Sequence, residues 1–209
     1  MKYLVLSAAV VALLAAASVP AFATLYHFVP SDADLNELTH QEAYRWGINL
    51  TLGENENICA AHLFFDNIYD WTCEPNVLYV SLLNNKPGYP FAALKIFTDN
   101  EATPNYFDGW GWGKTDLVTY TNMSTHPRDI TYNFTASQLT ALQNFLSDGN
   151  CAIAIDPDCH FYNCGVSLTV ETSVLQPPAQ ITPEPSTMML VISGLAATLG
   201  GGVLRRWRR

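Results

Sequence analysis

Basic residues are scarce in this sequence of 209 residues, and half of them lie at its two ends. Ten lysines and arginines compare with 19 aspartates and glutamates. Between residues 24 and 182 the basic residues number five: Arg45, Lys86, Lys95, Lys114 and Arg128. With 18 acidic residues in the same range, this body carries a net charge of −13. So acidic a chain does not neutralise phosphates, and the composition excludes nucleic acid as a partner.

The body also lacks the common catalytic signatures. It has no serine elbow, no Cys–His signature and no phosphate-binding loop. Carboxylates are plentiful, but glycoside hydrolysis needs two of them about 5–9.5 Å apart in a cleft, and the sequence alone places no such pair. We therefore predict a non-enzymatic protein. The alternative is a Ca²⁺-dependent carbohydrate-binding protein or glycan-active enzyme.

Long apolar runs are missing from the body and occur only at the two ends of the chain. At the N-terminus, Lys2 precedes an apolar stretch at residues 4–17, and the small residues Ala21 and Ala23 follow it. This is the pattern of a secretory signal peptide, so we expect residues 1–23 to be removed by cleavage after Ala23. An uncleaved membrane anchor is the alternative, and the short apolar stretch argues against it.

The C-terminal apolar run, residues 188–204, contains no charged residue. As a helix it would reach about 25 Å, at the short edge of what spans a bilayer. Four arginines follow it, at Arg205, Arg206, Arg208 and Arg209. Such a cluster stays on the cytoplasmic side, so the run can stop in the inner membrane with the body outside. Its marginal length favours a transient stop over a permanent span.

A proline-rich motif stands directly before this run, at Pro183, Glu184 and Pro185. The motif, the short apolar helix and the terminal arginines together resemble the PEP-CTERM sorting signal, which would occupy residues 183–209. The resemblance implies a Gram-negative source and cleavage near the motif by an exosortase, so that the tail is a removable address. It also implies delivery to the cell surface or extracellular matrix, in association with exopolysaccharide or biofilm. An ordinary tail anchor is the alternative.

The remaining chain is one domain at residues 24–172, followed by a proline-containing linker at residues 173–182. Period-two alternation predicts strands at residues 44–50, 58–68, 77–83, 91–97, 117–122, 130–134, 151–155 and 166–172. One helix is expected at residues 135–146, where Thr135 and Gln138 have the spacing of a capping box. These elements predict an all-β fold: an antiparallel, jelly-roll-like β-sandwich with one short helix.

All five cysteines lie in the body, at Cys59, Cys73, Cys151, Cys159 and Cys164. An exported domain with several cysteines favours disulfides, so we expect at least one bridge. The odd number leaves at least one free thiol, and the sequence does not determine the connectivity. None of the cysteines has the paired spacing of a zinc or redox site, so their predicted role is structural.

The densest polar segment is IDPDCHFYNCG, at residues 155–165. Asp156, Asp158 and Asn163 offer hard oxygen ligands at short spacing, a combination that suits Ca²⁺. The alternative is that the aspartates accept hydrogen bonds from nearby backbone amides in Asx turns. We favour the second interpretation and keep Ca²⁺ as a candidate.

Glycines separate two tryptophans, Trp110 and Trp112, in the segment FDGWGWGK. This spacing predicts a loop rather than a core strand. Exposed indole rings in such a loop would stack on the apolar faces of sugars, giving a candidate carbohydrate site. The alternative is that both rings close one end of the sandwich.

Overall fold

The computed structural model of the protein describes residues 23–30, 35–72, 75–86, 88–99 and 105–174. The expected signal peptide, except Ala23, and the whole expected sorting signal lie outside this part of the chain. Within the described part, no helix is both long and apolar enough to cross a membrane.

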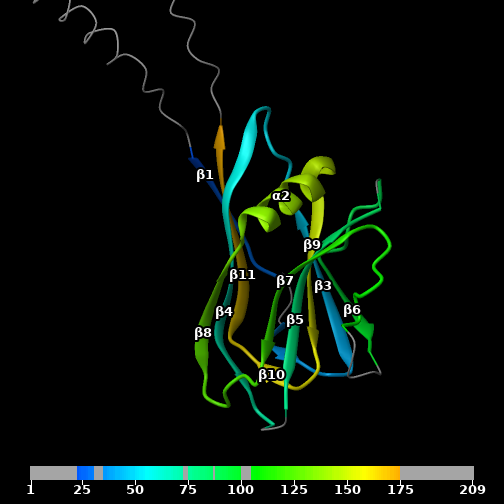
Figure 1. Cartoon of the computed structure of the whole chain (residues 1–209), viewed down its shortest axis with the longest axis vertical. Coiled ribbons are helices and arrows are strands. Elements are labelled where there is room, and N and C mark those ends of the chain that lie inside the picture. The colour runs from blue at the N-terminus through cyan, green and yellow to red at the C-terminus, as the bar shows by residue number, and fades with distance from the viewer. Residues whose placement is uncertain (1–22, 31–34, 73–74, 87, 100–104, 175–209) are drawn as a thin grey trace, which may run out of the picture. The chain divides into compact units, whose positions relative to one another are not determined.

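Eleven strands in the described residues form two antiparallel sheets (Figure 1). The first sheet contains β1 (Ala23–Phe28), β11 (Gly165–Val174), β4 (Glu56–Asp70), β10 (Phe161–Tyr162) and β2 (Glu37–Leu38) in this order, with β8 (Arg128–Asn133) also paired to β4. The second contains β6 (Leu94–Thr98), β3 (Glu42–Asn49), β9 (Asn150–Pro157), β5 (Val77–Asn84) and β7 (Lys114–Thr121) in this order.

The strand pairs are nested in the order of the chain. β1 pairs with β11, β3 with β9, β4 with β8 and β5 with β7. The first half of the chain therefore runs antiparallel to the second half, as in one long hairpin that is rolled into two facing sheets. This arrangement is the jelly roll, and it confirms the predicted fold class.

Every strand predicted from alternation is present, with its ends shifted by no more than three residues. Three strands were not predicted: β1, β2 and β10. The first follows the expected cleavage point, and the other two are only two residues long. One boundary is corrected. β11 continues to Val174, so its last two residues, which pair with β4, do not belong to a linker.

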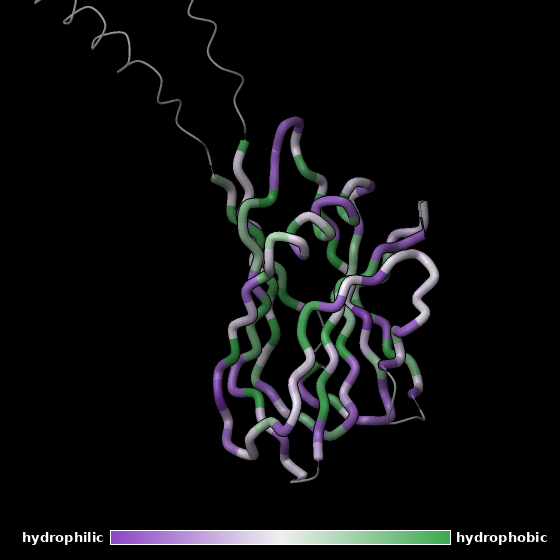
Figure 2. Tube along the Cα trace, viewed as in Figure 1, coloured by the Kyte–Doolittle hydropathy of each residue, from purple (hydrophilic) through white to green (hydrophobic). Residues whose placement is uncertain are grey.

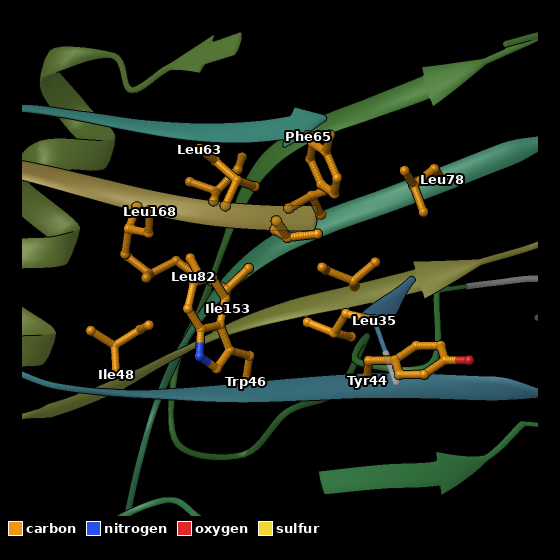
Figure 3. Close-up of a cluster of buried hydrophobic side chains, with 14 of the residues drawn as sticks. Leu35, Tyr44, Trp46, Ile48, Leu63, Phe65, Leu78, Leu82, Ile153 and Leu168 are labelled. Atoms are coloured by element: carbon orange, nitrogen blue, oxygen red, sulfur yellow. The ribbon is translucent and has the colours of Figure 1, made fainter. Parts of the chain in front are cut away.

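The core lies between the two sheets, and the strand periodicity explains which side chains reach it (Figure 3). On β3 the alternate residues Tyr44, Trp46 and Ile48 are each at most 3% exposed. Leu63 on β4 and Leu168 on β11 are fully buried opposite them. Hydrophobic residues concentrate along the strands, whereas the connecting loops are mostly hydrophilic (Figure 2). Burial of these side chains is the main stabilising contribution to the fold.

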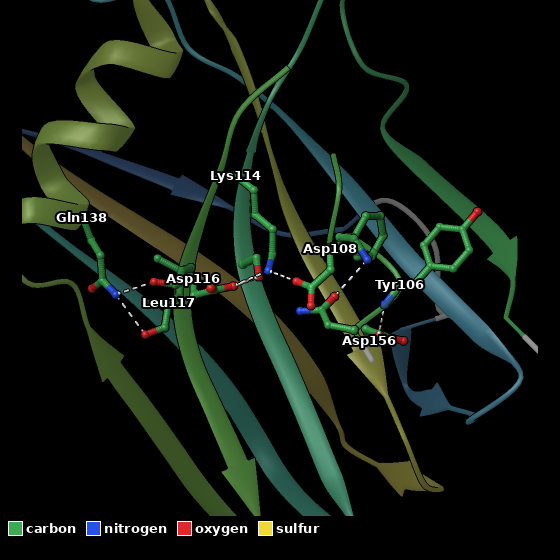
Figure 4. Close-up of polar contacts among 10 residues, drawn as sticks. Tyr106, Asp108, Lys114, Asp116, Leu117, Gln138 and Asp156 are labelled. Atoms are coloured by element: carbon green, nitrogen blue, oxygen red, sulfur yellow. Dashed lines mark hydrogen bonds and ion pairs between the residues drawn. The ribbon is translucent and has the colours of Figure 1, made fainter. Parts of the chain in front are cut away.

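The predicted helix is α2 (Ala136–Phe145), and a short 3₁₀ turn at Leu146–Asp148 follows it. The predicted capping box is confirmed, because Thr135 accepts from the amide of Gln138 and the Gln138 side chain accepts from the amide of Thr135. The same glutamine side chain donates to the carbonyl oxygens of Asp116 and Leu117 on β7. It therefore fixes the start of the helix to the second sheet (Figure 4).

The four described cysteines are free, so no disulfide forms among them. Cys59 and Cys164 are exposed, whereas Cys151 and Cys159 are buried. Burial raises the pKa of the Cys151 thiol, which keeps this residue in its unreactive, protonated form. The expected bridge is therefore not found among these four cysteines, and Cys73 lies outside the described residues.

Candidate functional site

The outer face of the second sheet is covered by a loop. We call residues 105–113 the aromatic loop; in Figure 1 it lies on the side of this sheet that faces away from the first sheet. Small side chains make room for it, since Ala43, Ala152 and Ala154 form a second hydrophobic cluster with Phe107, which is 1% exposed. The loop is thus part of the packed structure rather than a mobile connection.

A second loop, residues 85–93, crosses the same outer face near β3; within it Pro87 is not described. Its approach requires a glycine in the strand, because a Cβ atom at Gly47 would lie 2.3 Å from the carbonyl oxygen of Ala92. The Gly47 amide donates to the carbonyl oxygen of Ala93 at 2.8 Å. The absence of a side chain at this position therefore lets the second loop dock against β3.

Hydrogen bonds hold the aromatic loop in one conformation. The Asn105 side chain accepts from the amide of Phe107 at 3.0 Å. The indole nitrogen of Trp110 donates to the carbonyl oxygen of Asn84 at 2.8 Å. Asp156 on β9 accepts from the amide of Tyr106 at 2.7 Å (Figure 4). Both halves of the loop are therefore tied to the sheet beneath it.

Lys114 closes the loop with two ion pairs. Its ammonium lies 2.5 Å from Asp108 in the loop and 2.6 Å from Asp116 on β7 (Figure 4). Burial disfavours the charged ammonium, but the bonds to the two carboxylates outweigh this effect and raise the pKa of Lys114. The charge of this lysine is therefore already matched by protein carboxylates.

The structure separates the two tryptophans that the sequence placed together. Trp110 is half-buried, packs against Phe91 and Phe107 and uses its indole N–H within the protein. For this residue the prediction of an exposed stacking ring is wrong; the ring packs, but on the outer face of the second sheet and not at the end of the sandwich as the alternative had it. Trp112 is 51% exposed and retains the predicted geometry for stacking on a ligand.

A second exposed ring accompanies Trp112. Tyr89, on the second loop, is 64% exposed. The ammonium of Lys86 lies 4.7 Å from the centre of the Tyr89 ring and 5.6 Å from that of the Trp112 ring. We call the surface formed by Trp112, Tyr89 and the lysine that contacts both rings the ring pair; both contacts are cation–π interactions. The sequence did not reveal Tyr89, because it lies more than 20 residues before Trp112.

Asp156 is neither a Ca²⁺ ligand in a flexible loop nor the acceptor of the favoured Asx turn, because the amide that donates to it belongs to Tyr106, 50 residues away. Asp156 belongs to β9 and is 1% exposed. Burial raises its pKa to about 7, although the bond from Tyr106 opposes the shift, and the charges of Asp99 and Asp158 raise it further. The pKa of Asp158 is raised to about 6 by burial and by Asp99. Shifts of this size often mark catalytic groups, but Asp156 is too buried to meet a substrate.

The third predicted Ca²⁺ ligand, Asn163, is committed to the backbone. Its side-chain nitrogen donates to the carbonyl oxygen of Leu35 at 2.6 Å, and its oxygen accepts from the amide of Gly165 at 3.0 Å. Among the described residues there is also no group of three or more His, Cys, Asp or Glu side chains that fits a metal ion. The proposed trio of ligands therefore gains no geometric support.

A polar cleft of about 620 Å³ lies at the C-terminal end of α2. It is lined by Thr51, Leu52, Gly53, Asn55, Glu56, Asn57, Gln143, Asn144, Leu146, Ser147, Asp148 and Gly149. The Glu56 carboxylate accepts from the amide of Gly53 at 2.7 Å and from the hydroxyl of Tyr26 at 3.0 Å. The Gln143 side chain is likewise bonded to the backbone of Ile58 and Glu56. The Glu56 and Gln143 side chains, which are the groups best suited to bind a ligand in the cleft, are thus already engaged in hydrogen bonds within the protein.

No family model matches the chain, and no curated protein matches it. Solved structures give partial likenesses. The structure of tomato aspermy virus has 12% identity and a TM-score of 0.32, over 85% of this chain and 98% of that one. A family two carbohydrate esterase from Cellvibrio japonicus has 8% identity and a TM-score of 0.27, over 76% of this chain and 37% of that one. At these values the likenesses carry no argument about function.

Stability should fall as the pH rises, because the carboxyl of Asp156 is easier to protonate in the folded state than in the unfolded chain. Its pKa is about 7 when folded and about 3.9 when unfolded. The stabilisation of the folded state by this protonation is complete below about pH 4 and is lost as the pH rises through 7. We expect a higher Tm at pH 5 than at pH 8, and a smaller difference between the two for Asp156→Asn. At pH 8 the free energy of unfolding of this variant should exceed that of the parent by roughly 2 kcal/mol.

Thermal unfolding of both proteins across this pH range checks the prediction. Glu54→Gln is the matched control, since Glu54 is an exposed carboxylate on another loop. An Asp156→Asn variant with the same pH dependence as the parent would show that Asp156 does not titrate in this way.

Proposed function

We propose that the body is a non-catalytic carbohydrate-binding domain of an exported protein, and that the ring pair is its binding surface. One observation carries this proposal. Trp112 and Tyr89 are 51% and 64% exposed, although they stand on loops whose neighbouring rings are packed and hydrogen-bonded. Large exposed rings on a fixed framework are unfavourable for folding alone and are typical of recognition sites.

The chemistry of the ring pair suits sugars. Aromatic side chains present apolar faces, and pyranose rings carry C–H groups on theirs, so the two can stack. Lys86, which contacts both rings, adds a hydrogen-bond donor. Since the loops are tied to the sheet before any ligand arrives, little conformational entropy is lost on binding. This pre-organisation favours affinity from a small surface.

The export and sorting of the protein form a second part of the proposal. The support is the order of features in the sequence: a signal peptide at residues 1–23, the motif Pro183-Glu184-Pro185, an apolar run and the terminal arginines. We infer that an exosortase cleaves near this motif and that the body reaches the cell surface or the exopolysaccharide matrix. A domain that binds sugars would be retained in such a matrix.

Replacement of Trp112 by alanine should weaken sugar binding without unfolding the protein, because the ring is 51% exposed. The measurement is binding to an array of neutral and acidic oligosaccharides, followed by affinity electrophoresis on the polysaccharides that bind. We expect at least a tenfold loss, equivalent to about 1.4 kcal/mol. Trp71→Ala is the matched control, since Trp71 is also 56% exposed but stacks on His160 elsewhere. Equal loss in both variants, or none in Trp112→Ala, would contradict the assignment.

The sorting proposal predicts the mass of the mature protein. In a host that has the exosortase, intact-mass analysis should show a chain that begins after Ala23 and ends near Pro183–Pro185. Deletion of the exosortase should leave the tail in place and keep the protein in the membrane fraction. A chain that still ends at Arg209 in both strains would refute the proposed processing.

A further inference from the structure

The cations of this acidic protein are not spread evenly over its surface. Of the five in the body, three lie on the outer face of the second sheet, where Arg45 on β3, Lys95 on β6 and Lys114 on β7 alternate with the core-facing residues. A fourth, Lys86, stands in the second loop and contacts both rings of the ring pair. The remaining cation, Arg128, belongs to β8 of the other sheet.

Two of these cations are register partners. Arg45 and Lys95 face each other across the β3–β6 pair. Like charges at directly opposite positions destabilise a sheet. The guanidinium of Arg45 lies 4.3 Å from the centre of the Phe91 ring and 5.5 Å from that of Phe97, and burial lowers its pKa. Its Nε atom is buried and has no hydrogen-bond partner within the described residues. Aromatic rings, and not a carboxylate, therefore hold this charge.

Carboxylates do not compensate these charges in the described part of the chain. Among the described residues there are two ion pairs, and Lys114 makes both of them. Arg45, Lys86 and Lys95 instead contact aromatic rings, and Lys95 lies 4.7 Å from the centre of the Phe97 ring. Three cations therefore remain available to an anion, on the one face of an acidic body that gathers positive charge.

We propose that this face binds a polysaccharide whose sugar rings carry carboxylate groups. The inference rests on the proposed function and names the class of sugar. Trp112 and Tyr89 stack on the rings of the polymer, while Lys86 pairs with a carboxylate between them. Arg45 and Lys95 receive a second carboxylate further along the same face. A guanidinium offers a planar pair of donors to such a group.

The two halves of this surface are continuous. Phe91 and Tyr89 belong to the second loop, and Trp110 and Trp112 belong to the aromatic loop. The ring centres of Phe91 and Trp110 are 6.1 Å apart, and Arg45 lies 5.8 Å from the centre of the Trp110 ring. Tyr89 and Trp112 stand two residues from Phe91 and Trp110 in these loops, so a chain of sugars can reach from the ring pair toward Arg45. A linear polymer with repeated negative charges fits this layout better than a compact anion.

The experiment compares an oligogalacturonate with its fully methyl-esterified form, which has the same sugar rings and no charge. Calorimetry on the full chain purified without its signal peptide should give at least about tenfold tighter binding of the acid form. Arg45→Gln combined with Lys95→Gln, neither of which belongs to the ring pair, should lower this preference and leave binding of the ester unchanged. Arg128→Gln is the matched control and should change neither. Thermal unfolding verifies that each variant is folded.

The outcomes separate the two proposals. Equal affinity for acid and ester, unaffected by the double variant, overturns the acidic polysaccharide but leaves sugar binding intact. Binding of neither form, together with an array that shows no sugar ligand, overturns both. If Arg128→Gln weakens binding of the acid form as much as the double variant does, the attraction is a general charge effect and the assigned surface is wrong. Sulfated dextran serves as a further arm: tighter binding of it than of oligogalacturonate would overturn carboxylate recognition.

Discussion

The packing of Phe107 and Trp110 on an alanine-lined sheet face is the constraint on which the candidate site depends. A jelly roll normally buries one face of each sheet and leaves the other to water. Here the outer face of the second sheet carries the small side chains of Ala43, Ala152 and Ala154, which leave room for large rings to pack on it. The aromatic loop thereby becomes a second, smaller core. Because the loop is fixed, the exposed ring of Trp112 is held in one position and not averaged over many.

The distribution of charge adds a second constraint on the same face. In a body with a net charge of −13, most of the cations gather where the aromatic rings are. The rings accept these cations by contact with their π faces, so the positive charge is held without being neutralised. Lys114 differs, because it forms ion pairs with Asp108 and Asp116 and so helps to fix the aromatic loop. The surface thus combines apolar faces for sugar rings with cations for their acidic groups.

The sequence predicted the fold well because alternation reports burial directly. Each long strand has one face against the core, and Tyr44, Trp46 and Ile48 show this pattern clearly. The site was predicted less well, because it depends on contacts between distant segments. Nothing local distinguishes Trp110 from Trp112, and only the bond to Asn84 and the packing on Phe107 assign their roles. Asp156 was expected in a loop, as an Asx-turn acceptor or a Ca²⁺ ligand, because its bond to the amide of Tyr106 joins segments that are distant in the sequence.

An NMR titration tests binding by this surface most directly, because each indole N–H gives its own signal. When oligogalacturonate is added, the Trp112 signal should shift saturably. The signal of Trp71, which stacks on His160 outside the proposed surface, should not move. An unchanged Trp112 signal at saturating ligand, with shifts confined to Trp71 or to the cleft beside α2, would contradict the account.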